Sequence, residues 1–92
     1  MTLRKLSAMP YAQAHVEIDD NNNIYLFSYT TLVAGIYADG RCFCTGLYSM
    51  TTRKHISAFA REYANPLTYY DFKMAYENDF YINMYTGEIT EI

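Results

Sequence analysis

Two runs of β-branched and aromatic residues flank the pair Asp39-Gly40, and this arrangement limits the fold more than any other feature of the chain. Asp-Gly supplies the positive φ angles that a tight β-hairpin needs, so the two runs are predicted to pair as antiparallel strands. The first run, residues 24–37, is long for one strand. We therefore expect a bend or bulge near Ser28–Thr31, or two strands there, before the returning strand at residues 41–49.

Alternation of side-chain type predicts two further strands. In residues 10–18, small and apolar side chains alternate with polar ones, which places Val16 on one face and His15 and Glu17 on the other. Residues 19–23 contain only Asp and Asn and predict a turn. Residues 80–85 alternate in the same way and predict the last strand, with Ile82 inward.

The hydrophobic period changes to that of a helix after residue 50. Apolar residues follow at i, i+3, i+4 and i+7 in the segment 51–64, with Thr51 or Thr52 as the N-cap. The pair Asn65-Pro66 ends this helix and can cap a second one over residues 66–79. For that helix we expect three inward side chains, Leu67, Tyr70 and Met74.

This order of elements predicts an α+β fold: an antiparallel sheet of four to five strands with one or two helices packed on one face. The 92 residues suffice for one domain, 1–92. Within it we distinguish a central part, about 24–64, from an acidic, Tyr-rich C-terminal part, 66–92.

Charge is spread unevenly along the chain. Residues 1–60 carry five basic and four acidic side chains, whereas residues 61–92 carry two basic and six acidic ones. An acidic, Tyr-rich end suits contact with a basic partner surface, although it also describes a solvated face that keeps the protein soluble. The candidate partner-binding surface consists of Tyr69, Tyr70, Asp71, Tyr76, Glu77, Asp79, Tyr81 and Tyr85.

The start of the predicted helix is the second candidate site. Positive side chains are unusual in a first helical turn, because the helix dipole favours acidic residues there. Orphan backbone N–H groups together with Thr51, Thr52, Arg53, Lys54 and His55 could converge on a phosphate or carboxylate. The alternative is an ordinary solvated turn, in which His55 caps the helix or lies at the edge of the core.

Nothing in the sequence requires catalysis, a metal or a cofactor. The four glycines are scattered, so there is no phosphate-binding loop, and no serine lies in a nucleophile-elbow context. Cys42 and Cys44 would point to the same face of a strand, which favours small core residues over a zinc site or a disulfide. We expect a non-enzymatic protein without cofactors or bound metal. The N-terminal segment does not resemble a signal peptide, and no segment has the length of a membrane span.

Two short patterns, S-Y-x-T-x-V-A and Y-S-x-T-T-x-K-H-I followed by a phenylalanine, lie within residues 26–60. Their order and spacing resemble an uncharacterised family of small domains encoded by phages and by bacteria that carry mobile elements. The matching positions are Ser28, Tyr29, Thr31, Val33, Ala34, Tyr48, Ser49, Thr51, Thr52, Lys54, His55, Ile56 and Phe59. The resemblance implies a setting, the cytoplasm of a bacterial host, and no established activity.

These observations lead to three functional expectations. The first is a small binding protein that acts on a host protein or protein–nucleic-acid complex, as an anti-defence inhibitor of the anti-CRISPR kind. The second is a module that binds a phosphate ligand or nucleic acid through Thr51–His55. The third is a structural piece of a phage assembly. A homodimer could form through edge strands, for which residues 10–18 and 80–85 are the candidates.

Overall fold

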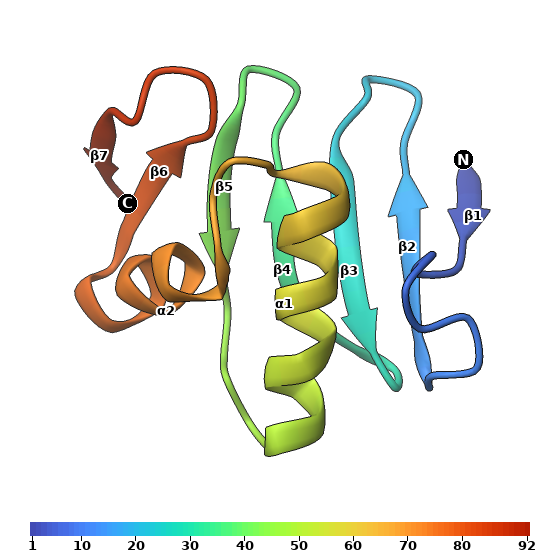
Figure 1. The fold of residues 1–92 in the computed structure, drawn as a ribbon. Coiled ribbons are helices and arrows are strands. Elements are labelled where there is room, and N and C mark those ends of the chain that lie inside the picture. The colour runs from blue at the N-terminus through green and yellow to red at the C-terminus, as the bar shows by residue number, and fades with distance from the viewer.

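All 92 residues are described by the computed structural model, in which one antiparallel sheet carries two helices on one of its faces (Figure 1). The seven strands follow one another across the sheet in chain order, and both helices come between the fifth and sixth strands. The elements are β1 (Thr2–Arg4), β2 (Ala14–Ile18), β3 (Ile24–Ser28), β4 (Thr31–Ile36), β5 (Arg41–Cys44), α1 (Met50–Tyr63), α2 (Tyr69–Asn78), β6 (Phe80–Asn83) and β7 (Ile89–Glu91). The predicted α+β class is confirmed.

The central hairpins form where the sequence predicts them. The β4–β5 turn holds Gly40 at a φ of 96°, and the Tyr37 N–H donates to the Arg41 carbonyl oxygen at 2.8 Å. The run 24–37 divides into β3 and β4, which is one of the two outcomes we expected. Tyr29 makes the turn between them at a φ of 57°, and the register shifts between Leu26 and Phe27.

The core lies between the helices and the sheet face that they cover. α1 packs over β3 and β4, and α2 packs over β5 and β6 (Figure 1). From α1 the predicted stripe of Ile56, Phe59 and Ala60 is buried, and Tyr63 is half-buried. Leu6, Val16, Leu26, Val33, Ala34, Cys42 and Phe72 are also fully buried. Cys42 and Cys44 face this core from the same side of β5, as predicted.

The sheet has two more strands than expected. β1 and β7 are three residues each and every side chain in them is exposed, so neither shows the alternation by which strands were predicted. They lie at the two edges of the sheet. The expectation that residues 10–18 and 80–85 contain edge strands is therefore wrong, because β1 pairs with β2 and β7 pairs with β6.

The second helix is shorter than predicted and turns a different side inward. Its N-cap is Thr68, not Asn65, so Pro66 precedes the helix. Phe72 and Ala75 are the buried residues of α2, whereas Tyr70 is 71% exposed and Met74 is 50% exposed. The inward assignment of Tyr70 and Met74 was wrong, and α2 instead presents both to solvent. Neither helix has the length and apolar character needed to cross a lipid bilayer.

Candidate functional site

The start of α1 is set by Ser49 and not by the threonines that follow it. Ser49 has an extended backbone, with φ −131° and ψ 171°, and its Oγ accepts a hydrogen bond from the Thr52 N–H at 3.2 Å. The predicted N-cap, Thr51 or Thr52, is therefore wrong by two or three residues. The error arises because several hydroxyl residues lie in a row, and only the one that stays extended can cap the helix.

Thr52 and His55 point into the protein from the first turns of α1. The His55 Nδ1 lies 2.8 Å from the Ser28 Oγ, and that Oγ lies 3.2 Å from the Thr52 Oγ1. All three residues are at most 4% exposed. Burial lowers the pKa of His55, so the imidazole is neutral at neutral pH. This cluster, which we call the Ser28–Thr52–His55 network, ties the end of β3 to α1.

The remaining residues of the predicted anion site point outward. Thr51, Arg53 and Lys54 are exposed, and neither Arg53 nor Lys54 forms an ion pair. The five predicted residues thus divide between the core and the surface and do not converge on one point. Because the neutral His55 is buried, the exposed side chains of this turn are those of Thr51, Arg53 and Lys54, which supply one hydroxyl and two cations.

The eight residues predicted as a partner-binding surface are also divided. Asp71 serves the helix itself, since its carboxylate accepts the Thr68 N–H at 2.7 Å and the Thr68 hydroxyl at 3.2 Å. Asp79 ends α2 in a left-handed conformation at a φ of 53°. Tyr81 lies on the opposite face of the sheet, 5.8 Å from Tyr37 between ring centroids. Tyr69 is half-buried, and its hydroxyl has no hydrogen-bond partner.

The other four, Tyr70, Tyr76, Glu77 and Tyr85, are exposed. Tyr70 and Met74 lie one helical turn apart on the outer side of α2, so they form a continuous apolar ridge. We call Tyr70, Met74 and Glu77 the α2 ridge. Met74 was missed from the sequence because it was assigned to the core. Six of the twelve large hydrophobic side chains that are exposed belong to residues 70–92.

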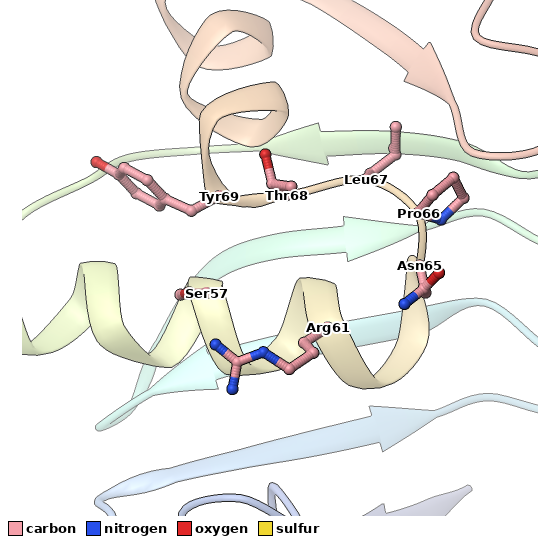
Figure 2. A pocket seen from close by; sticks show the side chains of 7 residues that line it. All are labelled: Ser57, Arg61, Asn65, Pro66, Leu67, Thr68 and Tyr69. Carbon is pink, nitrogen blue, oxygen red and sulfur yellow. The ribbon is translucent and has the colours of Figure 1, made fainter.

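A shallow hollow of about 170 Å³ lies beside this ridge, between α1 and the segment that leads into α2. Figure 2 shows Ser57 and Arg61 entering it from α1, and Asn65 and Thr68 from the connecting segment. The guanidinium of Arg61 forms no ion pair. It lies in the last turn of α1, where the helix dipole favours a cation. Because its guanidinium is unpaired, Arg61 can bond a carboxylate or an amide oxygen of a partner.

The hydrogen-bonded serine–histidine pair, Ser28 and His55, lies in the core at no more than 3% exposure. Burial raises the pKa of Cys42 to about 12 and that of Cys44 to about 11, so both thiols are protonated and unreactive at neutral pH. His15 lies 2.8 Å from Glu17 on the helix-free side of the sheet, and its ring forms no hydrogen bond with a serine, threonine or cysteine. No three His, Cys, Asp or Glu side chains come together as metal ligands would.

Comparison with known proteins gives one match. A family model described as a family of unknown function, DUF8033, covers residues 1–74. The chain belongs to this family. The match includes β1 to β5, α1 and α2 as far as Met74, and confirms that the family is an uncharacterised one. Searches among curated proteins and among solved structures found no match. Because the family has no known function, membership assigns no activity, and function has to be argued from the side chains.

Proposed function

We propose that this protein is a small, non-enzymatic binding protein that contacts a host macromolecule through the outer side of α2. The observation that carries this proposal is the α2 ridge, in which Tyr70 and Met74 expose apolar surface one turn apart beside the acidic Glu77. Tyr and Met are enriched at protein–protein contacts, and exposed apolar ridges rimmed by charge are typical of docking surfaces.

The polar surroundings of the ridge support a protein partner. Glu77, Asp79 and Glu88 are exposed acidic residues near the C-terminal end of α2 and after β6, and none of them forms an ion pair. Arg61 in the neighbouring hollow offers one cation. This combination suits a target that presents basic side chains to the helix end and a carboxylate or amide to Arg61.

The biological setting rests on the resemblance of the central segment to small phage-encoded domains. We place the protein in the cytoplasm of a bacterial host, where it would act stoichiometrically on a host component, as an anti-defence inhibitor does. The target is then a basic protein or a protein–nucleic-acid complex. The carboxylates of the α2 end would replace nucleic-acid phosphates in a basic groove of that target.

Affinity capture from a bacterial host lysate tests this function. The tagged protein is used at low and moderate salt, with and without nuclease. We expect one host protein to be retained at moderate salt after nuclease treatment. The double variant Tyr70→Ala/Met74→Ala should reduce retention at least tenfold, whereas Tyr11→Ala, which removes a 97% exposed tyrosine elsewhere, should leave it unchanged. Equal retention by wild type and the double variant would contradict a role for the ridge.

Charge reversal at Glu77 gives a second readout on the same partner. Glu77→Lys should weaken binding and flatten its dependence on salt, because one attractive pair is replaced by a repulsive one. Asp79 is tested by Asp79→Asn, since Asn tolerates the left-handed conformation that Asp79 holds. Retention that disappears with nuclease and in Arg53→Ala/Lys54→Ala would instead point to nucleic acid held at the exposed turn of α1.

A further inference from the structure

The face of the sheet that carries no helix is a second surface, separate from the α2 ridge. Figure 1 shows both helices on one side, which leaves the other side of all seven strands without a covering layer. Strand register identifies its residues, because directly paired residues share a face. Leu3, Glu17, Tyr25, Gly35 and Phe43 form one row across β1 to β5. We call this side the open face.

Aromatic rings run across most of the open face. His15 and Phe27 stack with centroids 5.0 Å apart and planes 4° apart. Tyr25 lies 6.5 Å from Phe43, Phe43 lies 5.2 Å from Tyr37, and Tyr37 lies 5.8 Å from Tyr81. The ring of Phe43 occupies the space above Gly35 that a side chain would fill. Of these aromatic side chains, all except Phe43 are half-buried, and Leu3 at the rim is 66% exposed.

The charged side chains of the open face are hydrogen-bonded within it. Arg41 bonds Asp39 at 2.8 Å, and its guanidinium lies 4.8 Å from the Tyr37 ring centroid and 4.9 Å from that of Tyr81. The His15 Nε2 and the Glu17 Oε2 lie 2.8 Å apart, and the Tyr25 hydroxyl lies 3.5 Å from the Asp19 Oδ2. No strand contains a lysine. Burial raises the pKa of the Tyr25 and Tyr37 phenols, which therefore stay neutral.

The composition of the open face favours some partners over others. A nucleic-acid backbone needs several unpaired Lys or Arg side chains, and here the unpaired ones are Arg4 and Lys5, which lie at one edge in a hollow with Leu3 and His15. Two copies of an aromatic face whose central arginine is already paired with Asp39 can pack on each other about a two-fold axis without a complementary charge. Tyr, Phe and Arg are also the residues that dominate the buried centres of homodimer interfaces.

The dimensions of the molecule leave room for a dimer interface of standard size on this face. The molecule measures 33 × 30 × 21 Å, and the shortest dimension corresponds to one sheet plus one helix layer. The face of the sheet therefore has an outline of at most about 1,000 Å², compared with about 800 Å² buried per partner in a standard interface.

We infer that the open face is a self-association surface, on which a second copy of this chain packs sheet against sheet. The result is a four-layer dimer with both sheets inside and all helices outside. The α2 ridges of the two copies remain accessible in this arrangement. The inference therefore does not depend on the proposed function, and the ridge variants and the open-face variants report on different surfaces.

Sedimentation velocity of the full chain over a hundredfold range of concentration tests the inference. We expect a species of twice the 10.7 kDa monomer mass at the upper end of the range. Tyr25→Lys should raise the dissociation constant of the dimer at least tenfold. The new ammonium can pair with Asp19, whose Oδ2 lies 3.5 Å from the Tyr25 hydroxyl oxygen, so the fold has a means of accommodating it. Circular dichroism checks that the fold is retained.

Leu3→Lys is a second variant that carries little risk of unfolding, because Leu3 is exposed in the isolated chain. It should also weaken the dimer, whereas the matched control on the helix side, Tyr70→Lys, should leave the dimer intact. A wild type that stays monomeric at the highest concentration overturns the inference, as does a dimer that survives both open-face variants. Binding of single-stranded oligo(dT) by a monomer would overturn it in favour of nucleic acid.

Discussion

At the scale of single residues, the Ser28–Thr52–His55 network accounts for much of the motif without any ligand. The serine and threonine hydroxyls supply the hydrogen bonds that the buried imidazole needs, and a buried polar group without a partner is costly. Each serine of the motif has a tyrosine beside it, Tyr29 or Tyr48, that is exposed and held at positive φ. The motif thus describes a strand-to-helix corner, with its hydroxyls inside and its phenols outside.

Two adjacent threonines of α1 allow a matched test of the network. Thr52→Ala removes a 4% exposed hydroxyl that bonds Ser28 and should lower the free energy of unfolding by about 1–2 kcal/mol. Thr51→Ala makes the same change at an exposed position one residue earlier and should stay within about 0.5 kcal/mol of wild type. Urea unfolding followed by circular dichroism measures both. Equal losses in the two variants would show that the network contributes nothing specific.

The lowered pKa of His55 predicts how stability depends on pH. Its ordinary value is 6.5, and burial moves the folded-state pKa below that value. Between the two pKa values the unfolded chain binds more protons, so the folded state loses stability as the pH falls from about 7 through 6.5 and toward the folded-state pKa. Above pH 7 the contribution is constant.

The comparison variant for this effect is His55→Gln. Its amide can still bond Ser28 but does not titrate, so its unfolding free energy should vary less than that of wild type between about pH 7 and pH 5. The lowered carboxyl pKa values of Asp19 and Asp39 affect stability only at more acidic pH, below this window. If the unfolding free energies of wild type and His55→Gln changed equally with pH, His55 would be excluded as the source of the pH dependence.

At the scale of the secondary-structure elements, the sequence predicts the strands around the Asp39-Gly40 turn and the buried stripe of α1 correctly. The sequence does not determine which side of α2 faces the core. Tyr69, Phe72 and Tyr76 recur with the same spacing as Leu67, Tyr70 and Met74, so two apolar stripes compete in one short helix. Packing favours Phe72, because it has no polar tip that needs solvent. The helix starts at Tyr69 because Thr68 is its N-cap. The Asn65-Pro66 pair just before it led to the prediction of an earlier start.

The capping box of α2 leads to a prediction for that element. Asp71→Ala removes the acceptor of the Thr68 N–H and a carboxylate at the positive end of the helix dipole, so it should destabilise the protein by about 1 kcal/mol. Glu77→Ala removes a carboxylate from the last turn, where the dipole disfavours one, and should be neutral or slightly stabilising. Thermal unfolding compares the two, and a larger loss in Glu77→Ala would refute the assignment of Thr68 and Asp71 as the cap.

At the scale of the whole molecule, the binding and self-association that we propose use opposite sides of the sheet. The helix side holds the core, and the α2 ridge lies on the outside of that layer. The helix layer and the sheet both lie between the ridge and the open face, so a partner on the ridge and a second copy on the open face would not compete for space. The open face was not evident from the sequence, because it combines residues from separate elements, such as Tyr25, Tyr37 and Tyr81. The ridge lies within α2 alone and was missed because Met74 was assigned to the core.

The two C-terminal strands, β6 and β7, contribute unequally to the stability of the fold, and a pair of truncations can measure the difference. Ending the chain after Tyr85 removes β7, whose side chains are all exposed, and it leaves Ile82 and the half-buried Phe80 in place. We expect this variant to fold, with a modest loss of stability, since it forfeits edge hydrogen bonds and no core side chain. Ending the chain after Asn78 also removes β6, which leaves Cys42 and Phe72 without the strand that covers them. That variant should lose cooperative unfolding in a thermal melt. A cooperative melt of the shorter variant at the wild-type temperature would show that the core closes at β5, and would shift the edge of the folded unit to that strand.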